Sequence, residues 1–148
     1  MSTNSTPVIA ALEQALADTY ALALKTQNYH WNVEGPNFFG LHNLFEEQYT
    51  DAHTAVDELA ERIRALGAPA PGGFQVFMDT TKIADAKQNT DATTMIDDLA
   101  ASHETMGETL RDGVAAAEEA RDPATADMLT ARLTIHDKHA WMLRSLKA

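Results

Sequence analysis

The chain has 148 residues, of which 45% are hydrophobic and only 7% aromatic. That length predicts a single domain with its own core, and recurrent alanine and leucine with few aromatics favour packed helices over a sheet. The absence of cysteine excludes disulfides, thiolate zinc sites and iron–sulfur clusters. A net charge of −11 disfavours binding to nucleic acid and anionic membranes, and it attracts cations.

The N-terminal segment up to Ala17 has no basic residues, and Glu13 and Gln14 interrupt its apolar run, so we expect no secretory signal. No stretch approaches the roughly 18 apolar residues that span a bilayer. These features predict a cytoplasmic protein with no membrane segment.

The first predicted helix has Pro7 at its first position, which suits proline, and it ends near Asn32. Its apolar residues recur every three or four positions, which is typical of an amphipathic helix. We expect residues 1–6 to form a short disordered tail and residues 7–148 to form the single domain.

The second predicted helix runs from Asn37 to Leu66, and Gly67 follows as a C-terminal stop. At 1.5 Å per residue it is about 43 Å long, beyond the usual length of a globular helix. Its apolar residues form one continuous stripe made of Phe38, Leu41, Phe45, Ala52, Val56, Leu59, Ile63 and Leu66.

The remaining helices are predicted over residues 92–120 and from the Asp122-Pro123 cap to the C-terminus. Residues 67–91 between the second and third long helices are too many for a tight turn, yet enough to cross a whole bundle. We expect a short helix over residues 78–86 of this connection. Two helical hairpins joined by one long crossover have the connectivity of ferritin-like bundles. The sequence therefore predicts an all-α, ferritin-like four-helix bundle with a crossover that contains a short helix.

Ferritin-like di-iron bundles usually carry a Glu-x-x-His motif on two helices. None of the six histidines here has glutamate three residues before it. Iron chemistry in this chain would therefore not be built inside one bundle in the usual way.

The second helix instead carries two pairs of candidate ligands. His42 and Glu46 are four residues apart, as are Asp57 and Glu61, so the members of each pair share a face about one turn apart. Glu46 and Asp57 lie within about 20° of the same face, but about 16.5 Å apart along the helix axis. That distance is too large for both to bind one ion, so the helix presents two half-sites.

The two pairs are placed symmetrically about the midpoint between residues 51 and 52. If two copies of the helix cross antiparallel about a two-fold axis there, His42 faces the partner's Glu61 and Glu46 faces the partner's Asp57. Such a dimer completes the ligand set once at each end of the contact. The alternative for each pair is a set of solvated charges on an amphipathic helix.

His30 is a further candidate ligand near the end of the first helix. The turn at Gly35-Pro36 can bring it alongside His42. The alternative is a histidine packed in the core beside its aromatic neighbours. A mixed set of imidazoles and carboxylates suits ferrous iron better than calcium, which prefers oxygen ligands.

Two segments of the chain carry a resemblance to a known family. They are YHWNVEGPNFFGLH over residues 29–42, and FEEQY with VDELAER over residues 45–62. With the HAWMLR ending, the chain resembles the Dps family, the mini-ferritins, over essentially its whole length. The resemblance implies a hollow dodecamer of tetrahedral symmetry that oxidises Fe(II), preferentially with hydrogen peroxide rather than dioxygen. It also implies storage of the ferric product as a mineral, which protects against oxidative damage.

The resemblance further implies inter-subunit ferroxidase centres, each with two iron ions. Many family members have aspartate in place of Glu46; both are oxygen ligands, so we expect a shift in geometry and not in function. Trp31 matches a tryptophan beside the family's centre, for which the resemblance implies a redox role in taking up stray oxidising equivalents. Packing of a buried tryptophan is an equally good explanation. The implied iron ligands are His30, His42 and Glu46 from one subunit, and Asp57 and Glu61 from its two-fold partner.

Two aspartates near the start of the last helix, Asp122 and Asp127, resemble the acidic lining of the family's iron-entry pores at the three-fold axes. For Asp122 the alternative is a helix cap. Surface or packing roles are the default for the other histidines, which are His53, His103, His136 and His139.

The sequence leaves three other functions to consider. Dps proteins that bind DNA usually have basic tails, whereas residues 1–6 contain no basic residue and residues 145–148 only Lys147. We therefore predict no direct DNA binding, and nucleoid association only if such binding is found. A purely structural bundle is the second alternative. The third is a haem-binding bacterioferritin, for which no methionine has an indicative spacing among Met95, Met106, Met128 and Met142.

Overall fold

A computed structural model describes residues 5–148 and confirms the all-α prediction. The expected tail falls mostly on residues 1–4, outside the described part, and the first helix already includes Ser5. The helices are α1 (Ser5–Asn32), α2 (Phe38–Ala65), α3 (Phe74–Thr80), α4 (Ala92–Glu119) and α5 (Pro123–Ser145).

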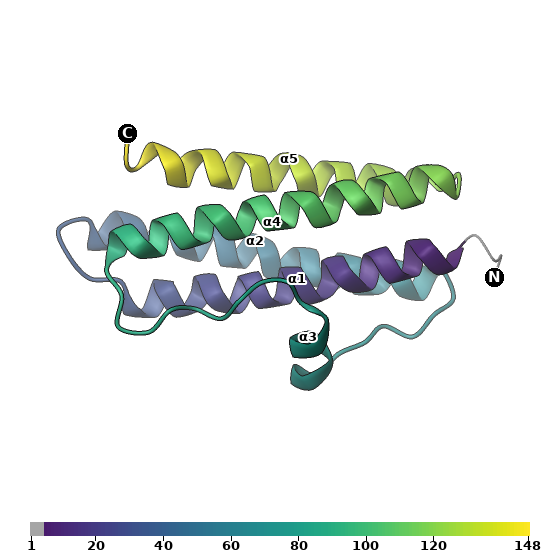
Figure 1. The fold of residues 1–148 in the computed structure, drawn as a ribbon, viewed down its shortest axis with the longest axis horizontal. Helices are drawn as coiled ribbons and strands as arrows, with labels where there is room; N and C mark the ends of the chain where they lie inside the picture. The colour runs from purple at the N-terminus through teal and green to yellow at the C-terminus, as the bar shows by residue number, and fades with distance from the viewer. Residues whose placement is uncertain (1–4) are drawn as a thin grey trace.

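The four long helices form two antiparallel pairs, α1 with α2 and α4 with α5, as Figure 1 shows. The connection from the end of α2 returns along α1 to the start of α4 at the opposite end of the bundle (Figure 1). This is the long crossover that the sequence predicts. Within residues 5–148, no helix has both the length and the apolar character that a membrane span requires.

Local sequence signals account for where the long helices begin and end. Gly67 adopts a φ of 97°, and its N–H donates to the carbonyl of Arg64 at the end of α2. At the start of α5, the Asp122 carboxylate accepts a hydrogen bond from the Thr125 N–H, and Asp91 caps α4 in the same way. The predicted bounds of the four long helices are right to within two residues, except at the end of α5, which was expected to reach residue 148 and ends at Ser145.

The apolar stripes of the helices meet in one core. Most of the predicted stripe on α2 is buried, but Phe38 at the start of that helix remains 42% exposed. Burial of each large apolar side chain contributes roughly 1.5–3 kcal/mol. The largest fully buried side chains include Tyr29, Phe45, Leu59, Ile63, Leu99, Met106, Leu110, Leu129 and Leu143.

The short helix of the crossover was predicted at residues 78–86, and that position is wrong. It lies at Phe74–Thr80. The carboxylate of Asp18 on α1 accepts one hydrogen bond from the Thr81 hydroxyl and one from the Lys82 N–H, both 2.7 Å long. These bonds hold the chain extended after α3, so the helix does not continue.

Candidate metal centre

Two histidines from neighbouring helices stack at one end of the α1–α2 hairpin. The rings of His30, in the last turn of α1, and His42, in the first turns of α2, have centroids 3.8 Å apart and planes 15° apart. His30 Nδ1 lies 2.7 Å from the backbone oxygen of His42, and His42 Nδ1 lies 2.7 Å from that of His30. Because a carbonyl only accepts, each Nδ1 donates a hydrogen. A neutral ring therefore keeps its Nε2 unprotonated, the form that binds a metal ion.

The turn between α1 and α2 makes this reciprocal contact possible. Gly35 has a φ of 117°, a conformation that residues with a side chain rarely adopt. The Gly35 carbonyl accepts a 3.1 Å hydrogen bond from the N–H of Phe38, where α2 begins. The turn thus brings His30 beside His42, as the spacing around Gly35-Pro36 predicts.

Aromatic rings hold the two imidazoles in place. Phe38 stacks on His42 with a centroid distance of 5.0 Å, and Tyr49 meets His30 edge-on at 5.2 Å. His30 is only 7% exposed, whereas His42 is half-buried. The next residue along, Trp31, is 59% exposed and is not a core residue of the single subunit.

The candidate carboxylates lie on an open face of α2. Glu46, Asp57 and Glu61 are all exposed. A hydrogen bond with Asp57 and the negative charge of that residue raise the pKa of Glu61 above its ordinary value. Like charges in contact repel, and a cation bound between them would relieve that repulsion.

Within residues 5–148 of one chain, the five predicted ligands do not converge on a common point. His30 and His42 meet at one end of α2, and Asp57 and Glu61 meet further along the same helix. One subunit thus holds the two groups apart, and their role as half-sites of a shared centre stays a prediction.

The two candidate pore residues differ in what surrounds them. The Asp122 carboxylate accepts hydrogen bonds from the N–H and the hydroxyl of Thr125, and it pairs with Arg62 at 3.1 Å. Burial by itself raises the pKa of Asp122, but the Thr125 hydrogen bonds and the Arg62 charge outweigh it and lower the pKa below its usual value. The capping role of Asp122 is therefore present in the single subunit. Asp127 is exposed.

A further histidine cluster, which the sequence did not predict, lies between α4 and α5. One ring nitrogen each from His103, His136 and His139 lies within 4.8 Å of the other two. The three-residue spacing of His136 and His139 places them on one face of α5, but no spacing relates them to His103 on α4. The remaining histidine, His53, is exposed and meets Tyr49 edge-on.

A four-helix bundle with a helix-bearing crossover, and with histidines and carboxylates placed along α2, defines a ferritin-like protein. A family model for the ferritin-like domain matches residues 9–147. The DNA protection during starvation protein 2 of Bacillus anthracis is 38% identical over 138 residues, which cover 93% of this chain and 94% of that protein.

Solved structures define the family more narrowly. The crystal structure of a Dps protein from Bacillus brevis has a TM-score of 0.96 and 34% identity, covering 100% of this chain and 99% of its own. A Dps protein from Vibrio cholerae, described as a member of a broad superfamily of ferritin-like diiron-carboxylate proteins, has a TM-score of 0.94 and 31% identity, with 99% and 92% coverage. The chain belongs to the Dps family of the ferritin-like superfamily.

Proposed function

We propose that this protein oxidises Fe(II) at ferroxidase centres shared between two subunits, and that it stores the ferric product as a mineral. The observation that carries the proposal is the reciprocal hydrogen bonding of His30 and His42. It fixes both rings with their Nε2 atoms available as ligands. The proposed ligands of two ferrous ions are His30, His42 and Glu46 of one subunit and Asp57 and Glu61 of the partner subunit.

The two-fold arrangement follows from the positions of the ligands along α2. The half-sites are about 16.5 Å apart on one helix, too far to close on each other. They are symmetric about the midpoint between residues 51 and 52, so an antiparallel copy of α2 supplies the missing half at both ends. The exposure of Glu46, Asp57 and Glu61 leaves this face of the helix open to such a copy.

The ligand types fit the proposed chemistry. Imidazole and carboxylate together suit ferrous iron as the substrate. Two ferrous ions held at one centre each give one electron to a single hydrogen peroxide, which becomes two hydroxide ions, so no hydroxyl radical is released. The residues of this chain bind and orient the ions, and the Nδ1 hydrogen bonds make His30 and His42 better ligands. We propose peroxide as the preferred oxidant and dioxygen as the alternative.

We also propose assembly into a hollow dodecamer of the kind typical of the family. The single subunit exposes large apolar side chains that an assembly would cover, among them Trp31, Phe39, Phe74 and Met78. Twelve subunits of 16.1 kDa would have a mass of about 193 kDa, which native mass spectrometry or light scattering measures. Asp122 and Asp127 are the proposed lining of the iron-entry pores.

Protection of DNA by this protein is proposed to act through removal of iron and peroxide in the cytoplasm and not through direct DNA binding. The net charge of −11 per subunit, multiplied over an assembly, repels the phosphate backbone. A gel-shift assay at low salt with divalent cations chelated should show free DNA. A strong shift under these conditions would contradict this part of the proposal.

Mixed assemblies provide the sharpest test of the shared centre. The His42→Ala subunit lacks one half-site and the Asp57→Asn subunit lacks the other. Each homogeneous variant, loaded anaerobically with Fe(II) and then given peroxide, should lose the saturable fast rise in ferric absorbance. Random co-assembly of equal amounts should restore about a quarter of the wild-type centres. A centre is intact only when the Asp57→Asn subunit supplies its His42 half and the His42→Ala subunit supplies its Asp57 half.

Native mass spectrometry verifies that the two variants co-assemble, and the exposed His53→Ala variant on the same helix serves as the control that keeps the wild-type rate. Absence of recovery in verified mixed assemblies would mean that the centre is not shared between subunits. A wild-type fast phase in either homogeneous variant would overturn the ligand assignment itself.

A further inference from the structure

We infer that His103, His136 and His139 form a second metal site, contained within one subunit, for a divalent transition-metal ion that prefers imidazole nitrogen. His103 lies on α4, and the other two lie one turn apart on α5. One ring nitrogen of each is within 4.8 Å of the other two. The site uses none of the residues of the proposed ferroxidase centre and needs no partner subunit.

The hydrogen bonds show where the protons of this cluster are. Burial lowers the pKa of His136 to about 3 and that of His103 well below its ordinary value, so both rings are neutral at pH 7. A guanidinium only donates, so the Arg132 nitrogen that lies 3.1 Å from His136 Nε2 makes this Nε2 an acceptor. The hydrogen of His136 is therefore on Nδ1, which donates to His103 Nδ1 at 2.9 Å.

This assignment leaves one hydrogen without a partner. Because His103 Nδ1 accepts, the hydrogen of that neutral ring is on Nε2. His103 is only 3% exposed, and its Nε2 has no hydrogen-bond partner among the described residues. An unpaired buried donor costs about 1–3 kcal/mol, and this hydrogen stays on Nε2 when an ion binds through Nδ1, so the metal assignment is carried by the closeness of the three rings and not by this atom.

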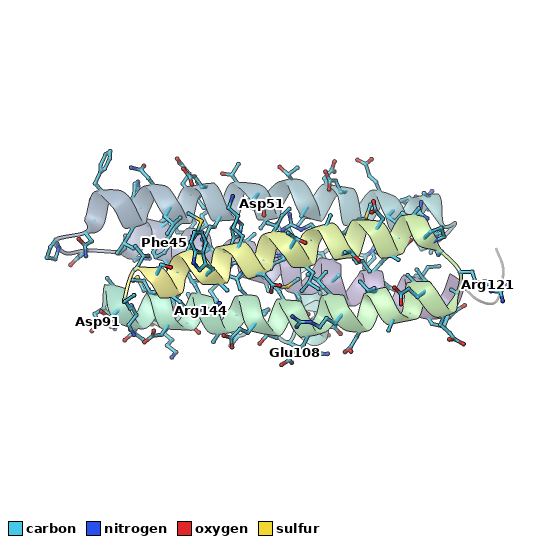
Figure 2. All side chains as sticks on the ribbon, turned by 90° about the horizontal axis from the view of Figure 1, so that it is seen from above. Phe45, Asp51, Asp91, Glu108, Arg121 and Arg144 are labelled. Carbon is cyan, nitrogen blue, oxygen red and sulfur yellow. The ribbon has the colours of Figure 1, made fainter. Side chains whose placement is uncertain are left out.

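Other unpaired polar atoms gather in the same layer of the bundle. Over residues 5–148, the buried side-chain atoms without a partner are His103 Nε2, Arg132 Nε and both amide atoms of Gln48. Arg132 bonds His136 and also Asp51, and Gln48 lies one turn before Asp51 on α2. Figure 2 shows Asp51 about midway along α2, so this layer lies in the middle of the bundle. Apart from Gln48 Oε1 these atoms are donors, so they mark a polar layer around the three rings and are not themselves ligands of a cation.

The donor atoms define the class of ion. Three neutral imidazoles with no carboxylate among the ligands favour Zn²⁺, Co²⁺, Ni²⁺ or Cu²⁺ over Mg²⁺ and Ca²⁺. Nitrogens bound to one such ion at about 2.1 Å lie about 3.0–3.4 Å apart. The Nδ1 atoms of His103 and His136 are 2.9 Å apart, close to that range. The ring nitrogen of His139, within 4.8 Å of the other two, must move closer for one ion to bind all three.

Besides the movement of His139, binding requires one proton to change its place. An ion that takes the lone pairs of both facing Nδ1 atoms displaces the hydrogen between them. That hydrogen moves to Nε2 of the His136 ring, which then releases Arg132. Arg132 keeps its two hydrogen bonds to Asp51, at 3.0 and 2.9 Å, so its charge stays paired. Asp51 also supplies a negative charge close to the bound cation.

Zn²⁺ alone is the probe for the test. The His42→Ala/Asp57→Asn double variant removes the proposed ferroxidase centre. It leaves His103, His136 and His139, the inner cluster, as the remaining proposed metal site. After exposure to Zn²⁺ and removal of free metal, it should retain one ion per subunit by elemental analysis. Adding His139→Gln should weaken Zn²⁺ binding at least about tenfold in a calorimetric titration, as expected for loss of a metal contact. His139 makes no side-chain hydrogen bond in the described structure, so this change leaves the hydrogen-bond network of the fold intact.

The matched control is His53→Gln in the same background, which should bind Zn²⁺ unchanged. Anomalous scattering from a Zn²⁺-soaked crystal should place the ion among His103, His136 and His139. No retained ion in the double variant, unchanged affinity on adding His139→Gln, or a water molecule instead of zinc at the cluster would each overturn the inference. None of these outcomes depends on whether the wild-type protein oxidises iron.

Discussion

The two histidine groups of this subunit differ in which ring nitrogens the protein itself occupies. Backbone carbonyls accept the Nδ1 hydrogens of His30 and His42, so both Nε2 atoms are left for a ligand. In the inner cluster the rings of His103 and His136 bond to each other, and Arg132 donates to the outer nitrogen of His136. The first pair is oriented by the backbone, and the second by other side chains.

This difference separates a site that is completed by assembly from one that is completed inside the chain. The proposed shared centre lies open on the surface of the single subunit, where water can satisfy its polar groups in the absence of a partner. A buried cluster has no such reserve, so every unpaired nitrogen costs stability unless a ligand takes it. The exposed carboxylates of α2 and the buried rings of His103 and His136 illustrate the two situations.

The largest effect is expected at His30 and His42, the outer pair, where one variant distinguishes metal binding by the ring from a structural role. His30→Gln keeps a side-chain donor for the His42 carbonyl but removes the free imidazole nitrogen. The initial rate of Fe(II) oxidation by peroxide should fall by about 100-fold or more, as expected for loss of a metal ligand. His53→Gln should keep the wild-type rate, and a His30→Gln rate within twofold of wild type would show that His30 is not a ligand.

The next prediction concerns the charge pair beneath the inner cluster. Asp51→Asn leaves the Arg132 guanidinium, whose side chain is only 7% exposed, without an anionic partner. The free energy of unfolding should fall by about 2 kcal/mol, somewhat less than for a fully buried pair because Asp51 is partly exposed. Denaturant unfolding of metal-free protein at equal protein concentration measures the change. Glu46→Gln on the open face should alter stability by less than about 0.5 kcal/mol; equal losses in both variants would contradict the contrast.

The inner histidines should also make the metal-free protein sensitive to acid. The unfolded chain protonates His136 near pH 6.5, whereas the folded protein resists until about pH 3. The free energy of unfolding is therefore unaffected by His136 above about pH 6.5. It falls as the pH drops from there towards 3, by up to about 1.4 kcal/mol per pH unit for this residue. Burial lowers the pKa of His103 and His139 too, so they add to the slope. Chemical unfolding with a chelator present should show a smaller slope in His136→Gln, and an identical slope would be evidence against a neutral buried cluster.

The smallest effect is expected at the turn that joins the outer pair. Gly35→Ala forces a side chain into a positive φ, which should cost about 1 kcal/mol in unfolding free energy. It should also slow Fe(II) oxidation, because the turn positions His30 against His42. Gly40→Ala lies in a helix with no atom within 4 Å of the added carbon, so it should be neutral or slightly stabilising. If both variants behave alike, the turn does not set the histidine geometry.

Local rules were enough to predict much of this protein from its sequence. Three-four periodicity located the long helices, and the capping chemistry of Asp122 and the backbone freedom of Gly67 marked their ends. The closeness of Asp57 and Glu61 on one face of α2 could be predicted because a helix relates residues four apart by fixed geometry. The contact of His30 with His42 could be predicted because only a short glycine turn separates them.

The tertiary structure alone decided features that join residues distant in the chain. The crossover helix ends early because Asp18 bonds Thr81, which is 63 residues away, and no local signal near residue 81 reveals that partner. The inner cluster depends on α4 packing against α5, which sets His103 against His136, 33 residues later. Periodicity assigns a residue to a face of its helix, but the packing of the helices determines which faces meet.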